Sequence, residues 1–274
     1  SCLFFRGKIH STEKHEMVNP AIKRRYIQSF SILSLLLSAM LTLADSHAIE
    51  KHFSSGNNKV LLVELFTSEG CSSCPPAEKW MNSLKDDPRL WNQFVPVAFH
   101  VDYWDYIGWK DPYATSDNSI RQRKYKQQGN LRTVYTPGMM LDGKEWRSWH
   151  YKRHVPPSGE SVGNLDVTVK GDDISATFQP VADLPTDWEL NVAILGFQLR
   201  SNVSAGENSG RRLNQEFVVL AHKTMTSSNG KWKIKLPNVK KEYAQHTGLA
   251  VWVNKKGLQT PVQATGGWLS EQKE

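Results

Sequence analysis

Cysteine is scarce in this chain. Its 274 residues include three cysteines, and Cys2 lies in an N-terminal stretch, residues 1–16, that lacks the pattern of a folded core. We exclude that stretch from the predicted fold, which leaves Cys71 and Cys74. Two cysteines cannot form a four-cysteine zinc site within one chain, so a metal site would also need histidine or carboxylate ligands.

The apolar run at residues 30–44 is short for a membrane-spanning helix. It has 15 residues, whereas a span needs about 20. Three basic residues at 23–25 precede it and a small-x-small pattern, SHA at 46–48, follows it, as in a cleaved signal peptide. We therefore predict an upstream segment and signal peptide over residues 1–48 and an exported protein with no stable membrane span in its mature form. An uncleaved N-terminal anchor is the alternative.

The basic charge is modest once this segment is set aside. Residues 1–48 hold six of the basic and three of the acidic residues, so the formal net charge falls from +7 to +4. The basic residues of RQRKYK at 121–126 sit among polar residues on a predicted helix, which favours a solvated face. We expect no nucleic-acid binding. The β-rich second half also lacks a nucleophile elbow, a phosphate loop and paired carboxylates.

The first half of the mature chain predicts an α/β unit over residues 49–155. Two apolar runs of strand length, 60–66 and 94–101, flank a predicted helix at 75–84, and this order implies a parallel βαβ unit. A second helix is expected from residue 116 or 117 to 128. An antiparallel hairpin is expected at 137–141 and 144–147, around Asp142-Gly143.

The second half of the mature chain predicts a β-sandwich domain over residues 160–270. It follows a linker-like stretch, PPSG at 156–159, and holds seven runs of strand length. These runs are 165–170, 173–178, 188–199, 216–222, 231–236, 249–254 and 258–264.

Cys71 and Cys74 directly follow the first apolar strand, and this position is typical of a thiol-disulfide site. A helix N-terminus favours a thiolate, so we expect Cys71 to attack and Cys74 to resolve the mixed disulfide. A structural disulfide is one alternative. Another is a copper or zinc site in which Cys71 and Cys74 are joined by His100 or Asp102, which share a face at the end of the second strand. A hydrogen-bonded His-Asp pair closing the strand end is the plainer interpretation of the latter two.

An aromatic segment at residues 102–114 follows the second strand. It carries Trp104, Tyr106 and Trp109, which we predict to form a lid or substrate platform beside the cysteines. Aromatic packing under a long loop is the alternative.

Four blocks carry a family resemblance: VELFTSEGCSSCPPAEKW at 63–80, VAFHVDYWDYIGWKDPYA at 97–114, RQRKY at 121–125 and VYTPGMMLDGKEW at 134–146. With GENSGR at 206–211, they resemble the bacterial secreted, thioredoxin-like family catalogued as a domain of unknown function. The resemblance implies a periplasmic or secreted bacterial protein. It also implies a fold in which an α/β thioredoxin-like domain is followed by an all-β sandwich domain.

Further parts resemble thioredoxins proper. Thr136-Pro137 corresponds to their cis-proline, which receives substrate, and Glu64 to their buried acid, although Glu64 lies seven residues before Cys71 instead of six. Gly70 stands where thioredoxins have an aromatic residue. Pro75 directly follows Cys74, which predicts that Cys74 avoids helical backbone angles.

The sequence thus predicts an exported thiol-disulfide oxidoreductase. Its substrates would be protein or small-molecule thiols and disulfides, its electrons would come from a redox partner protein, and it would need no organic cofactor. A metal-delivery module and a partner-binding scaffold with an inert disulfide are the alternatives.

Overall fold

Two buried parallel strands and the helix between them place the cysteines. The computed structural model describes residues 50–152, 154–182, 187–243 and 246–270, so the predicted signal peptide lies outside the described residues. Strands β2 (Leu61–Thr67) and β3 (Phe94–His100) pair in parallel and are buried along their length, as their apolar runs predict. Helix α2 (Pro75–Ser83) connects them, with prolines in its first positions.

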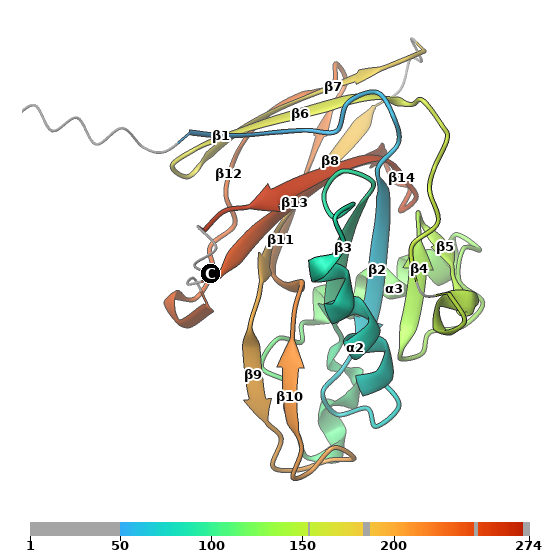
Figure 1. Cartoon of the computed structure of the whole chain (residues 1–274), viewed down its shortest axis with the longest axis vertical. Helices are drawn as coiled ribbons and strands as arrows, with labels where there is room; N and C mark the ends of the chain where they lie inside the picture. Colours follow the sequence, from blue (N-terminus) through green and yellow to red (C-terminus); the bar gives the residue numbers. More distant parts are fainter. Residues whose placement is uncertain (1–49, 153, 183–186, 244–245, 271–274) are drawn as a thin grey trace, which may run out of the picture. The chain divides into compact units, whose positions relative to one another are not determined.

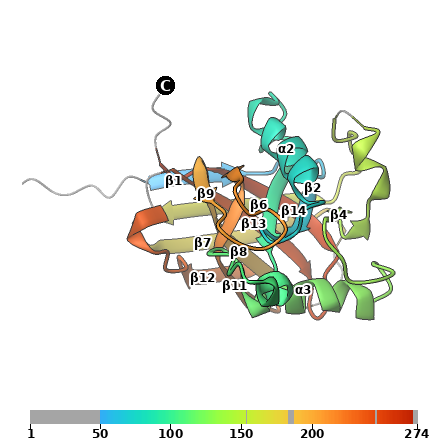
Figure 2. The ribbon, with the colours of Figure 1, turned by 90° about the horizontal axis from the view of Figure 1, so that it is seen from below.

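Helices α2 and α3 (Ser116–Gln127) lie on opposite faces of this sheet (Figure 2). Thr67 bonds Glu78 of α2, whereas the ring of Phe66 lies 6.2 Å from that of Tyr125 of α3. Neighbouring strand residues point to opposite faces, so these contacts fix the side of each helix. The Thr115 hydroxyl caps α3 by accepting from the backbone of the first turn.

The predicted hairpin follows α3. It consists of β4 (Gly138–Leu141) and β5 (Lys144–Glu145), and β4 pairs antiparallel with β2. Asp142 and Gly143 both have positive φ, 50° and 78°, as a tight two-residue turn requires.

The predicted fold, an α/β thioredoxin-like domain followed by an all-β sandwich, is wrong. The described residues are mostly strand, and strands from both halves join one eight-stranded mixed sheet in the order β14-β13-β8-β11-β3-β2-β4-β5 (Figure 1). The joint is β11 (Val218–Ser227), which lies parallel to β3, with Val218 opposite Ala98. Pairing of this kind satisfies the outer edge of β3, and it depends on residues more than a hundred positions away that local patterns do not reveal.

The remaining strands of this sheet come from the second half and correspond to predicted runs. They are β8 (Trp188–Gly196), β13 (Thr247–Lys255) and β14 (Pro261–Trp268). One buried cluster therefore spans both halves and includes Phe66, Phe99, Phe217 and Trp252.

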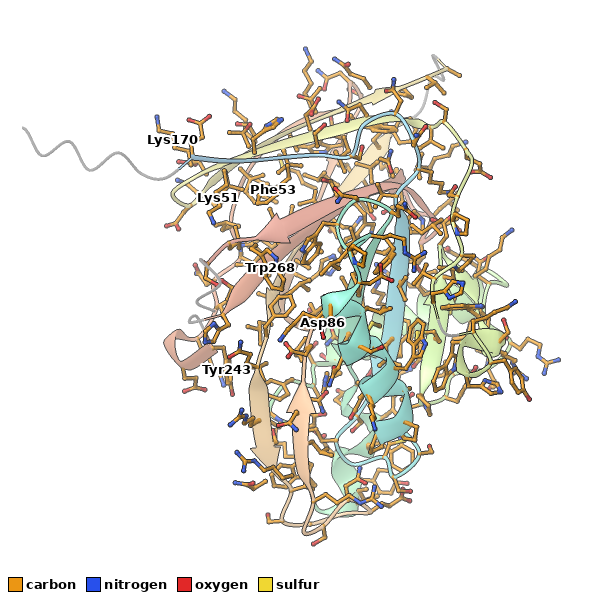
Figure 3. The ribbon with its side chains drawn as sticks, viewed as in Figure 1. Lys51, Phe53, Asp86, Lys170, Tyr243 and Trp268 are labelled. Atoms are coloured by element: carbon orange, nitrogen blue, oxygen red, sulfur yellow. The ribbon has the colours of Figure 1, made fainter. Side chains whose placement is uncertain are left out.

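A second, four-stranded antiparallel sheet packs on part of the large one. It has the order β1 (Glu50–Ser54), β6 (Gly163–Lys170), β7 (Asp173–Pro180) and β12 (Lys231–Lys235). The apolar core between the two sheets includes Phe178 and Trp232. Figure 3 labels Lys51 of β1 and Trp268 of β14, where the lysine Nζ donates to the tryptophan carbonyl at 3.1 Å.

A two-stranded ribbon, β9 (Leu199–Asn202) and β10 (Arg212–Gln215), runs beside α2 (Figure 1). This ribbon was not predicted from the sequence. The other short elements are the 3₁₀ helices η1 (Leu84–Asp86), η2 (Asp102–Ile107), η3 (Arg147–His150) and η4 (Lys241–Tyr243). Among the described residues, none of the helices combines the length and the apolar character needed to cross a bilayer.

Candidate functional site

The loop between β2 and α2, residues 68–74, contains both cysteines and is called the cysteine loop below. Cys74 occupies the N-cap position of α2, its N–H donates to the Cys71 carbonyl at 3.2 Å, and its own carbonyl accepts from the first turn of the helix. Its backbone is helical (φ −78°, ψ −37°) although Pro75 follows. The predicted departure from helical angles is therefore wrong, because the capping bonds hold this residue in the helical region.

The two thiols are free, buried and chemically unequal. Each has 0% of its surface exposed, and Cys71 Sγ lies 3.2 Å from Ser73 Oγ. A hydrogen bond from the Cys74 thiol, aided by Ser73 and Thr136 against the effect of burial, lowers the pKa of Cys71 to about 6. Burial, together with the neighbouring Cys71, raises the pKa of Cys74 well above its usual value. At neutral pH the pair thus combines a thiolate with a protonated thiol.

Glu78, in the first turn of α2, is a buried acid close to Cys74. Its Oε1 accepts from Thr67 Oγ1 at 2.6 Å and its Oε2 accepts from Gln215 Nε2 at 3.2 Å. Burial raises the pKa of Glu78 to about 7, although the charge of His100 opposes this rise. Glu78 was not among the residues predicted from the sequence. The available signal was its spacing of four residues from Cys74, which places both on one side of the helix.

Thr136 and Trp104 lie at the same site. The Thr136–Pro137 peptide bond is cis, and the Trp104 indole N–H donates to Thr136 Oγ1 at 2.7 Å. Because the Thr136 hydroxyl also lowers the pKa of Cys71, the structure brings Trp104, Thr136 and Cys71 together.

Glu64 lies elsewhere. It is on the α3 face of β2, where Arg121 Nε donates to its Oε1 at 2.8 Å and the Tyr125 hydroxyl donates to its Oε2. The structure therefore does not bring Glu64 to the cysteines. Arg121 is 7% exposed, so the predicted solvated face of this helix does not include it. Arg123, Lys124 and Lys126 are exposed as predicted.

His100 pairs with Asp111 and not with Asp102. His100 Nδ1 lies 2.7 Å from Asp111 Oδ2, and both side chains are fully buried. Burial disfavours the charged imidazole, but the Asp111 carboxylate, with Glu78 and Glu69, raises the pKa of His100 to about 9. Asp102 instead accepts from the Ser119 hydroxyl of α3. Within the described residues, no three His, Cys, Asp or Glu side chains gather as metal ligands would.

The predicted aromatic platform is only partly at the site. Trp109 donates to Glu69 Oε2 at 3.0 Å, whereas Tyr106 is 82% exposed and points away from the core. A side-chain carbon at Gly70 would lie 3.2 Å from Ile107 Cδ1 and 3.3 Å from Trp104 Cβ. The close approach of η2 explains why glycine precedes Cys71.

The connection between β9 and β10, residues 203–211, also contacts the cysteine loop. Asn208 Nδ2 donates to the carbonyls of Glu69 at 2.8 Å and Cys71 at 2.9 Å. Glu207 Oε2 accepts from the backbone N–H of Ser72 at 2.9 Å and from its hydroxyl at 2.7 Å.

Comparisons with known proteins identify a family and a fold. Residues 62–254 match the model of a family described as "Protein of unknown function (DUF1223)", which confirms the predicted resemblance to a family of unknown function. No curated protein matches the chain. A crystal structure of protein AGR_C_4864 from Agrobacterium tumefaciens is 24% identical, with a TM-score of 0.56 over 79% of this chain and 98% of that one. HBP35 of Porphyromonas gingivalis is 15% identical, with a TM-score of 0.51 over 80% of each chain. At these identities the likeness shows a shared fold alone.

Proposed function

The chain belongs to the DUF1223 family, described as of unknown function, and we propose from the site itself that Cys71 and Cys74 form a redox-active dithiol that exchanges disulfides with partner thiols. The observation that carries the proposal is the inequality of two thiols in contact at the start of one helix. Cys71 is favoured as thiolate by the Cys74 hydrogen bond, and Cys74 keeps its proton because it is buried.

The reaction has two exchange steps. In the first, the Cys71 thiolate attacks a partner disulfide, forms a mixed disulfide and releases one partner thiolate. In the second, Cys74 loses its proton and attacks Cys71 Sγ, which releases the second partner thiol and leaves a Cys71–Cys74 disulfide. Two electrons pass to the partner, and the reverse sequence oxidises a partner dithiol.

The residues around the pair support each step. Thr136 and Ser73 stabilise the Cys71 thiolate before attack. Glu78, whose pKa is about 7, is a group that can accept the Cys74 proton across the Thr67 hydroxyl during the second step. We propose that the protein works after export, on the strength of the signal pattern at residues 23–48 and because disulfides persist in oxidising compartments.

A trapping experiment tests the assignment of roles. The Cys74→Ser variant, incubated with a disulfide-bonded peptide, should accumulate a mixed disulfide at Cys71, detected by mass spectrometry without reductant. Cys71→Ser should accumulate none and should lose peptide reduction while still folding. Equal trapping by both variants, or full reductase activity in Cys71→Ser, would exclude the mechanism.

The two alternatives receive less support. Metal delivery needs further ligands beside the cysteines, and His100 and Asp102 are each held by other partners. An inert structural disulfide does not account for the lowered pKa of Cys71.

A further inference from the structure

We infer that the β9–β10 connection, residues 203–211, is a clamp that controls access to Cys71, with Glu207 and Asn208 as the positioning residues that hold it closed. The inference rests on the proposed role of Cys71 as the attacking thiol. It adds a condition to that role, since a partner has to open the clamp before the sulfur can be reached.

The proposed nucleophile is buried. Cys71 has 0% of its surface exposed, although Ser72 and Ser73 beside it are exposed. Attack on a disulfide requires contact between sulfur atoms. The cysteine loop in this closed conformation therefore has to move, and the bonds that hold the loop determine how often it does.

The clamp is hydrogen-bonded to the residues around Cys71. Asn208 is fully buried and its single amide group bonds the carbonyls of Glu69 and Cys71, while Glu207 bonds both polar groups of Ser72. The contacts thus bracket Cys71 on both sides along the chain. They come from a segment that lies 135 to 139 residues further along the chain. These bonds can therefore break without unfolding β2 or α2, which flank the cysteine loop.

The clamp can move as a unit, because its two ends are hydrogen-bonded to each other. Val203 N–H donates to the Arg211 carbonyl at 2.9 Å and Gly210 N–H donates to the Val203 carbonyl at 2.8 Å, which closes the connection on itself. It touches η2 through Gly206, where an added side-chain carbon would lie 3.1 Å from Ile107 Cδ1. Glu207 is exposed, so a partner can compete for Ser72 directly.

Alkylation of the reduced protein by iodoacetamide tests the clamp without any redox partner. One lost hydrogen bond corresponds to about a five-fold rise in the alkylation rate at Cys71. Glu207→Ala and Asn208→Ala each remove two bonds to the cysteine loop, so both should react at least about five-fold faster than wild type. Ser209→Ala is the matched control, because this serine bonds Ser204 within the connection and not the cysteine loop. Its rate should equal that of wild type.

The pH profile of the same reaction separates access from acidity. A clamp alters how often Cys71 is reached, so the midpoint should stay near the wild-type pKa of about 6 while the plateau rises. Unchanged rates in both variants would overturn the inference, as would a midpoint moved to that of an ordinary thiol. Faster alkylation with a fixed midpoint in a protein that fails to exchange disulfides would keep the clamp and remove the proposed function.

Discussion

Thr67 Oγ1 donates a 2.6 Å hydrogen bond to Glu78 Oε1, which joins the last residue of β2 to the first turn of α2. The same hydroxyl interacts with the Cys74 thiol and lowers its pKa, while the charge of Glu78 raises it. The thiol and the carboxylate are thus coupled through one buried hydroxyl group. This coupling makes Glu78 the residue to test first.

Replacing Glu78 with glutamine should slow the second exchange step and leave the first unchanged. The variant keeps the hydrogen-bond acceptor but loses the base, so release of the second partner thiol should be slower by about 10- to 100-fold. In wild type this step should quicken as pH rises through about 7, where Glu78 ionises. Rapid-quench analysis of the mixed disulfide measures the step, and an unchanged pH profile in Glu78→Gln would contradict the role.

The acidity of Cys71 should depend on Cys74. The hydrogen bond from the Cys74 thiol is the largest contribution to the lowered pKa of Cys71. A hydrogen bond to a charged group contributes about 1.5–3 kcal/mol, so Cys74→Ala should raise the Cys71 pKa by about 1–2 units. Thiolate absorbance against pH provides the measurement. Ser73→Ala is the companion variant and should produce a smaller rise, since its contribution is smaller.

Stability of the reduced protein should show two opposing pH dependences. The pKa of His100 is raised from 6.5 to about 9, so its contribution is full below pH 6.5 and is lost as pH rises through about 9. The pKa of Cys71 is lowered from 9.0 to about 6, so its contribution grows between those values as pH rises. Wild type should therefore change little over this range.

Removing the Cys71 contribution makes the pH dependence due to His100 measurable. Cys71→Ser should lose stability between pH 6.5 and about 9, on the order of 3 kcal/mol at about 1.4 kcal/mol per pKa unit. The double variant Cys71→Ser/His100→Gln should lose much less stability over the same pH range. Urea unfolding at several pH values supplies the data, and a flat profile in Cys71→Ser alone would show that His100 is not charged in the folded protein.

Arg121 should matter for folding and not for thiol chemistry. It donates to Glu64 and Gln259, and its guanidinium carbon lies 5.1 Å from the ring centres of Phe99 and Trp252. Arg121→Met leaves the buried Glu64 carboxylate without its cation, which is expected to destabilise the protein by about 3–5 kcal/mol. The double variant with Glu64→Gln should regain part of that loss. A changed Cys71 pKa in Arg121→Met would contradict the separation of the two sites.

The local elements could be predicted because each depends on its own residues. Apolar runs predicted β2 and β3, the segment between them predicted α2, and Asp142-Gly143 predicted the β4–β5 turn. Sheet order could not be predicted in the same way. The pairing of Val218 with Ala98 joins segments far apart in the chain, and it converts two expected domains into one shared sheet.

The site shows the same division. Cys71, Cys74 and Thr136 come together as expected from motifs that lie near strand ends. Glu64 could not serve the cysteines because it is three residues before Thr67 on β2, an odd spacing that turns it to the opposite face. The helix spacing from Cys74, which was not used in the prediction, is the better guide, because it leads to Glu78. Asn208 reaches the loop only through a ribbon that no local pattern predicts.

The reduction potential of the Cys71/Cys74 couple tests the central claim most directly. Equilibration of the protein with glutathione redox buffers, followed by alkylation and mass analysis, gives the fraction oxidised at each ratio. We expect a reversible two-electron transition with a potential between about −270 and −120 mV, the range of working dithiols. A pair that never forms a disulfide, or one that stays oxidised below about −300 mV, would contradict the account.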